Sequence, residues 1–203
     1  MTTSLQTPGL ASRVPESEVA EPAVAAPRSA WRWLWILLVV LFVFAATYAL
    51  AWFNANQLTT RFVRDADASF AAGNYLDALV GYEKFDEQTQ EYVNYGGYLA
   101  VEKIWSNRYS WPQPAAVAHA LARSQEIIQQ RLTLEAAEQY IQANIGKPAP
   151  YFGEIYLRLG ELYEEDGSVA DHLDIYESIP DLFGSRPDLI EQSQLHLSRL
   201  QNS

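Results

Sequence analysis

The chain has 203 residues, which is enough for one membrane-spanning segment and one further domain. It carries 25 Asp and Glu against 14 Lys and Arg, a net charge of −11, and so lacks the basic balance that nucleic-acid binding requires. Because it has no cysteine, disulfides, thiolate nucleophiles and cysteine metal sites are excluded.

Residues 1–30 are predicted to form a disordered N-terminal tail. Four prolines interrupt any helix in this segment, and large apolar side chains are too few to form a core. The prolines are Pro8, Pro15, Pro22 and Pro27. A docking motif or a modification site in the tail is the functional alternative.

Residues 31–53 are predicted to form a transmembrane signal-anchor helix. From Trp33 to Phe53 the sequence has no charged residue, glycine or proline. A helix of this length extends for roughly 31 Å, which matches a hydrocarbon core of about 30 Å. Aromatic residues, which favour the head-group layers, stand at both ends of the run. They are Trp31, Trp33, Trp35, Tyr48 and Trp52.

The end of this run leaves a second interpretation open, a cleavable signal peptide. Ala49 and Ala51 provide the pair of small residues that a signal peptidase requires. The apolar run is long for a signal peptide and a long segment precedes it, so the sequence favours an uncleaved anchor. Glycine and proline are absent between Trp31 and Gly73. We therefore expect the helix to continue, or to break only briefly, before the next domain.

Positive charges near the run predict its orientation. Arg28 and Arg32 lie close to its start, whereas Arg61 and Arg64 follow its end at a greater distance. Because positively charged flanks tend to stay in the cytoplasm, we expect a cytoplasmic N-terminus and an extracytoplasmic helical domain. The acidic charge of that domain argues against flat adsorption onto anionic lipid.

Residues 54–203 are predicted to form an all-α domain. Apolar residues recur there at three- and four-residue steps, without the strand-like alternation that flanks hairpin turns. The segment also repeats itself at an interval of 94 positions. The matched residues are Phe62 and Tyr156, Ala66 and Gly160, Gly73 and Gly167, and Tyr82 and Tyr176. Asn74 and Ser168, which follow the two turn glycines, are expected to cap the next helices.

This pattern resembles the tetratricopeptide repeat (TPR) family, whose repeats are 34-residue helix-turn-helix pairs. The best match is the run Tyr156-x-x-Leu159-Gly160-x-x-Tyr163-x-x-x-Gly167. The resemblance implies a helical-repeat (α-solenoid) domain with a neighbouring helix packed closely against Gly160. Its units are expected at about 59–92, 115–149 and 153–186, with a capping helix at 187–201.

An irregular aromatic insertion at about 91–114 interrupts the repeat spacing. Two interpretations stay open: its aromatic side chains pack into the domain core, or they form an exposed surface that grips a partner. The candidate partner contacts are Tyr95, Tyr98, Trp105 and Trp111.

No catalytic constellation is apparent in the sequence, and we expect no cofactor, no metal site and no enzymatic activity. The histidines His119, His172 and His196 are scattered, without a second ligand at metal spacing. The sequence has no phosphate-binding glycine loop and no nucleophile elbow.

These features favour a non-catalytic, membrane-anchored TPR-like scaffold or chaperone-like adaptor, because helical repeats present a concave surface to peptides and proteins. Its expected partners are membrane proteins or a protein complex at the bilayer surface, with lipid around residues 31–53. In layout the chain resembles the single-span bacterial ancillary factors of the Sec translocon. The alternative function is a structural accessory subunit of one fixed multi-subunit membrane complex.

Overall fold

The computed structural model describes residues 28–201 of the chain. The predicted tail, residues 1–30, lies outside the described residues except for its last three, which belong to the first helix. The chain divides into two compact units, residues 1–46 and residues 47–203.

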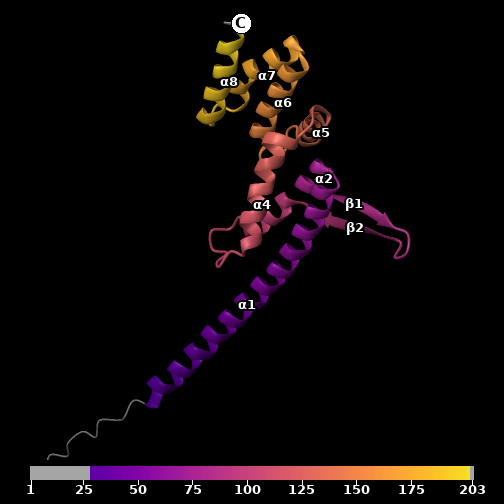
Figure 1. Cartoon of the computed structure of the whole chain (residues 1–203). Coiled ribbons are helices and arrows are strands. Elements are labelled where there is room, and N and C mark those ends of the chain that lie inside the picture. The colour runs from indigo at the N-terminus through magenta and orange to yellow at the C-terminus, as the bar shows by residue number, and fades with distance from the viewer. Residues whose placement is uncertain (1–27, 202–203) are drawn as a thin grey trace, which may run out of the picture. The chain divides into compact units, whose positions relative to one another are not determined.

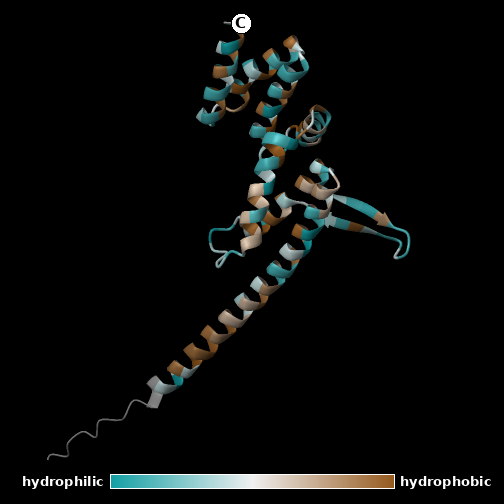
Figure 2. Cartoon of the chain, viewed as in Figure 1, coloured by the Kyte–Doolittle hydropathy of each residue, from teal (hydrophilic) through white to brown (hydrophobic). Residues whose placement is uncertain are grey.

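Helix α1 (Arg28–Ala71) has 44 residues and supplies all the described structure of the first unit. It continues for so long because no glycine or proline interrupts it. It ends just before Gly73, whose φ of +81° few other residues adopt. The prediction that the helix continues past the apolar run is therefore confirmed. Its large apolar side chains between Trp31 and Phe44 are exposed, in the part coloured brown in Figure 2.

The second unit is mostly helical, as predicted (Figure 1). After α1 its elements are α2 (Tyr75–Val80), β1 (Gly81–Asp86), β2 (Glu91–Gly96), α3 (Tyr98–Trp105), α4 (Ala115–Glu126), the π-helical turn η1 (Ile127–Arg131), α5 (Leu134–Asn144), α6 (Phe152–Asp166), α7 (Val169–Leu182) and α8 (Pro187–Gln201). Extensive packing joins α3 with α4, α5 with α6, α6 with α7, and α7 with α8.

The β1–β2 hairpin corrects the prediction of an all-α domain without hairpins. Its strands pair antiparallel, with Tyr82 opposite Tyr95. The helix expected to run through Tyr82 stops at Gly81, whose φ is +83°. A Cβ atom at Gly81 would lie 2.5 Å from the carbonyl oxygen of Tyr95, so a larger residue does not fit there. The predicted unit at 59–92 thus contains the six-residue α2 and a strand where a second full helix was expected.

The two turns marked by glycine in the sequence are present. Gly73 and Gly167 adopt positive φ in the turns that follow α1 and α6. Asn74 and Ser168 follow them and precede α2 and α7, but neither side chain makes the expected capping hydrogen bond. These turns therefore depend on the backbone freedom of glycine more than on side-chain caps.

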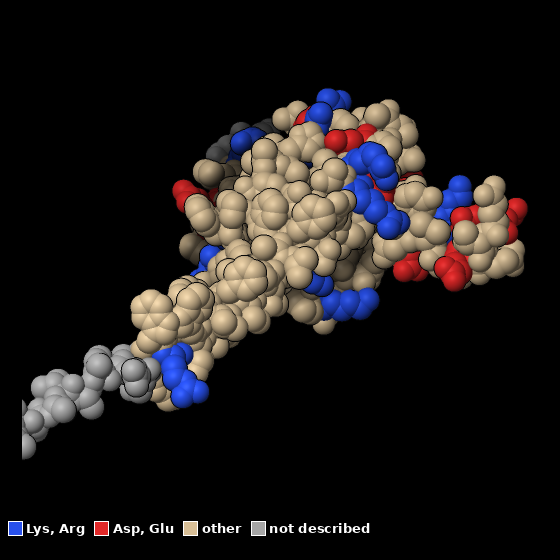
Figure 3. All heavy atoms as spheres, turned by 90° about the horizontal axis from the view of Figure 1, so that it is seen from below, with Lys and Arg blue, Asp and Glu red and all other residues tan. Residues whose placement is uncertain are grey.

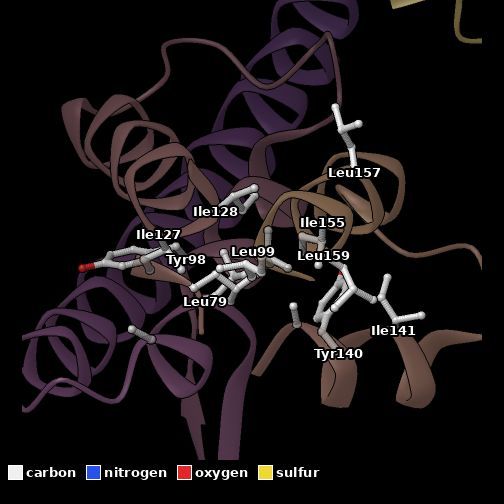
Figure 4. Packing of buried hydrophobic residues seen from close by; sticks show 14 of the residues in the cluster. Leu79, Tyr98, Leu99, Ile127, Ile128, Tyr140, Ile141, Ile155, Leu157 and Leu159 are labelled. Atoms are coloured by element: carbon white, nitrogen blue, oxygen red, sulfur yellow. The ribbon is translucent and has the colours of Figure 1, made fainter. Parts of the chain in front are cut away.

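A hydrophobic core extends through the second unit, and Figure 4 shows part of it. Side chains from α2, α3 and η1 converge at one place, and side chains from α5 and α6 at another. The largest fully buried apolar residues are Leu79, Tyr98, Val101, Ile127, Ile155, Tyr176, Ile179 and Leu189.

Gly160 lies in the contact between α6 and α7. A Cβ atom at Gly160 would lie 2.7 Å from Cε1 of Tyr176 and 3.0 Å from Cγ2 of Ile175. Tyr176 is fully buried, so its ring has little room to move aside. The predicted contact of a neighbouring helix with Gly160 is therefore confirmed.

Candidate protein-contact site

The structure divides the four predicted contact aromatics between three places. Tyr98 and Trp105 of α3 are buried. The hydroxyl of Tyr98 donates to a carboxylate oxygen of Asp67 at 2.5 Å, and Nε1 of Trp105 donates to Oγ1 of the buried Thr59 at 2.7 Å. Both partners lie on α1. For these two residues the core interpretation holds, and they cannot contact a partner while the domain is folded.

Tyr95 and Trp111 lie elsewhere. Tyr95, on β2, is half-buried because its ring stacks on that of Tyr82, with centroids 4.8 Å apart and the planes 7° from parallel. Trp111 lies between α3 and α4 and is 76% exposed. The four residues thus do not form one surface, and only Trp111 is free for a contact along most of its side chain.

Sequence reasoning missed the β1–β2 hairpin, which carries one of the exposed aromatic surfaces of the second unit. Its register places one aromatic pair on each face, Tyr82 with Tyr95 near the base and Phe85 with Tyr92 nearer the turn. The Phe85 and Tyr92 rings meet edge to face at 5.2 Å. Both remain exposed, Tyr92 by 73%.

The base of the hairpin is fixed to α1. A Cβ atom at Gly96 would overlap the ring of Phe62, and the guanidinium of Arg61 donates to the carbonyl oxygen of Asn94 at 3.4 Å. Among residues 28–201 the sheet has two strands, so each strand keeps one edge without a backbone partner. Such edges accept a further strand from another chain.

The exposed part of the hairpin is acidic. Figure 3 shows carboxylates gathered on the lobe that the hairpin forms at the right. They belong to Glu83, Asp86, Glu87 and Glu91, and Lys84 is the only base in the hairpin. Acidic groups beside an exposed aromatic pair suit a partner surface that combines apolar and basic side chains.

A second concave surface lies between α4, η1, α6 and α8, around a cavity of about 490 Å³. Its two arginines already pair with carboxylates of the protein. Arg158 pairs with Glu161 at 2.8 Å and with Glu165 at 3.0 Å. Arg186 pairs with Asp188 at 2.7 Å and with Glu154 at 2.8 Å, and these hydrogen bonds raise the pKa of Arg186. A ligand in this cavity would have to compete with internal ion pairs, so we favour the hairpin as the contact site.

The histidines take part in structural contacts. Nε2 of His119 lies 2.9 Å from the Asp67 carboxylate that also accepts from Tyr98. Burial, followed by the hydrogen bond to Asp67, raises the pKa of Tyr98, so its hydroxyl stays protonated and acts as the donor. His172 is buried beside Tyr176, with ring centroids 6.1 Å apart. The contact of His119 joins α4 to α1, whereas His172 and Tyr176 both belong to α7.

Among residues 28–201 no group of three or more His, Asp or Glu side chains is placed to hold a metal ion. The candidate contact site is the hairpin, an acidic two-stranded sheet with an exposed aromatic pair. No family model, curated protein or solved structure matches the chain.

Proposed function

We propose that the protein is a non-catalytic, membrane-anchored interaction module that holds a partner protein at the bilayer surface through the β1–β2 hairpin. One observation carries the proposal: the hairpin presents the exposed Phe85–Tyr92 pair on a two-stranded sheet fixed to α1. A two-stranded hairpin is only marginally stable by itself. A hairpin with exposed aromatic rings is stabilised by a partner that covers those rings.

The anchor in this proposal is the apolar part of α1. One described helix is long and apolar enough to cross a membrane, and the side chains of its most apolar stretch are not buried in the protein. Phe42, for example, is 72% exposed. The core helix of a soluble domain hides such side chains from water, whereas a membrane helix presents them to lipid. The exposure thus favours a span.

The helices α5 to α8 provide the scaffold in this proposal. Each packs against the next along the chain, and α6 contacts α7 closely at Gly160. We infer a TPR-like stack for this part of the domain, with the sequence motif of α6 at its centre. In this proposal the stack supports the hairpin, and the concave surface beside α6 and α8 keeps its internal ion pairs.

The proposal is tested by removing the exposed pair from the full-length protein. We expect Phe85→Ser with Tyr92→Ser to abolish co-isolation of the partner from native membranes in mild detergent. The melting temperature should barely change, because substitutions of exposed residues usually alter stability by less than about 0.5 kcal/mol, and one cross-strand pair contributes up to about 1 kcal/mol. Val169→Ser, at a residue 62% exposed on α7, is the matched control and should keep the partner.

The same co-isolation experiment distinguishes a scaffold from the alternative function, an accessory subunit of one fixed complex. A scaffold or adaptor should recover several proteins at less than one copy each, and an accessory subunit should recover one complex at a fixed ratio. If the double variant keeps the same partners as the wild type while folded, the hairpin is not the contact site and the proposal fails.

A further inference from the structure

Two of the most exposed aromatic side chains outside α1 and the hairpin lie in the segment 106–114, which joins α3 to α4. Tyr109 is 69% exposed and Trp111 is 76% exposed. Neither side chain belongs to the hairpin or to the buried core. Large aromatic rings in water are unfavourable, so a contact that covers them is expected.

The backbone of this segment is tied to α1 by two aromatic side chains. The hydroxyl of Tyr48 donates to the carbonyl oxygen of Trp111 at 2.5 Å and accepts from the N–H of Trp111 at 3.1 Å. Nε1 of Trp52 donates to the carbonyl oxygen of Pro112 at 2.8 Å. The position of the segment along α1 is therefore defined by Tyr48 and Trp52.

Tyr48 and Trp52 lie at the C-terminal end of the apolar run, which finishes at Phe53 and is followed by Asn54 and Asn56. Tyr48 precedes Phe53 by roughly 7–8 Å of helix. In a helix that spans the bilayer, this end lies where hydrocarbon meets the head groups. The segment 106–114 is attached at that level, which is the layer that Tyr and Trp rings prefer.

The charge around the segment also suits a lipid surface. The chain has a net charge of −11, yet residues 22–64 and 103–125 contain no Asp or Glu. Their exposed basic residues include Lys103 and Arg108, which are close to the aromatic rings in the sequence. Arg61 and Arg64 are also exposed but pair with Asp65 at 3.8 and 3.7 Å. Figure 3, a view from below, shows a broad area of uncharged residues with Lys and Arg side chains at its margin.

Arg108 lies directly beside the rings. Its guanidinium stands 4.7 Å from the centroid of the Tyr109 ring and donates to the Tyr109 hydroxyl at 2.6 Å. A basic residue near a membrane surface is attracted to anionic head groups. The acidic charge of the domain argues against adsorption of the whole domain onto lipid. Residues 22–64 and 103–125 do not carry that charge.

We propose that residues 106–114 form a second membrane contact, with Tyr109 and Trp111 in the head-group layer and Arg108 beside the lipid phosphates. The inference rests on the proposed insertion of α1 and goes beyond it, because a single helix leaves the domain free to tilt and rotate above the bilayer. A second contact fixes the height and the rotation of the domain, and so the direction in which the hairpin is presented.

The chain has no cysteine, so single-cysteine variants can be labelled at one position each. The full-length variants Trp111→Cys, Tyr92→Cys and Phe42→Cys each receive a bimane label and enter vesicles of phosphatidylcholine and phosphatidylglycerol. The vesicles carry a nitroxide quencher either at the head group or deep in the acyl chains. Both leaflets contain the quencher, so the orientation of the protein does not affect the result. Circular dichroism verifies that each variant is folded.

We expect the head-group quencher to reduce the emission of the label at position 111 severalfold more than that at position 92. Tyr92 is the matched control, because its side chain has similar exposure and the hairpin leaves α1 near Arg61 and Phe62. The deep quencher should act on the label at position 42. If position 42 is quenched and position 111 is not, the second contact is refuted and the anchor stands. If neither position is quenched, the anchor itself fails.

Discussion

Gly160 shows how a single missing side chain positions two helices. We expect Gly160→Leu to lower the free energy of unfolding by about 1–3 kcal/mol, because the added atoms overpack the contact between α6 and α7. The position of a Cβ atom, 2.7 Å from the ring of the buried Tyr176, leaves no room for the larger side chain. Urea unfolding of the detergent-solubilised protein, followed by circular dichroism, measures the change.

Gly184 provides the control for this substitution. It is exposed, and a Cβ atom there would lie at an ordinary 3.4 Å from the carbonyl oxygen of Pro180. Gly184→Leu should therefore alter stability by less than about 0.5 kcal/mol. Equal unfolding midpoints for the two variants would contradict the close packing at Gly160.

The roles of the aromatic residues in the segment 91–114 could be predicted only in part from the sequence. The sequence identified the cluster at 91–114 and left open whether it is core or surface. Tyr98 and Trp105 are core residues because their polar atoms reach Asp67 and Thr59, which lie far away in the sequence. Trp111 is exposed although it belongs to the same cluster. Burial depends on these long-range contacts, which composition and periodicity do not contain.

Glu164 joins three helices, and its ionisation couples their packing to pH. Its carboxylate on α6 accepts from the hydroxyl of Tyr176 on α7 at 3.0 Å and lies 3.0 Å from Nδ1 of His196 on α8. Burial opposes ionisation, but the hydrogen bonds with His196 and Tyr176 outweigh it, so the pKa of Glu164 is lowered. A carboxyl group whose pKa is lower in the folded protein stabilises the fold above its unfolded pKa, and this contribution disappears as pH falls through the folded pKa.

We therefore expect the melting temperature of the wild type to fall as the pH decreases below about 5, with a contribution from Glu164. Glu164→Gln should be less stable than the wild type at neutral pH, and the difference between the two should shrink toward acidic pH. Differential scanning calorimetry at several pH values measures it. A difference that stays constant with pH would mean that the ionisation of Glu164 does not contribute to stability.

The hairpin is the element that the sequence interpretation missed, and the reason is physical. Leu76, Leu79 and Tyr82 have helical spacing, so a period of three to four residues extends past the true end of α2. The helix ends because Gly81 takes a positive φ and packs closely against the backbone of Gly97. That approach is a contact between distant residues. The aromatic pairs that face each other across the strands indicate a hairpin. They can be recognised only when the register of the strands is known.

The apolar run and the helix that contains it could be predicted from the sequence, because continuous helicity and apolar length are local properties. The absence of glycine and proline carries α1 as far as Ala71, well past Phe53. The order of the C-terminal helices could also be predicted, since α6, α7 and α8 begin close to the expected turns. The proposed site could not, because it depends on a hairpin and on a surface defined by tertiary contacts.

The orientation of the whole molecule in the membrane is the remaining prediction. Arg28 and Arg32 are closer to the apolar run than Arg61 and Arg64 are, so we expect the N-terminus in the cytoplasm and the hairpin outside it. In intact cells a membrane-impermeant maleimide should label Val169→Cys, which is exposed and lies outside the proposed contact site. It should label Ser17→Cys only after lysis, and the cysteine-free wild type is the blank for both. Labelling of Ser17→Cys alone would reverse the orientation. Loss of the residues before Trp52 from the mature chain would instead show that the apolar run is a cleaved signal peptide.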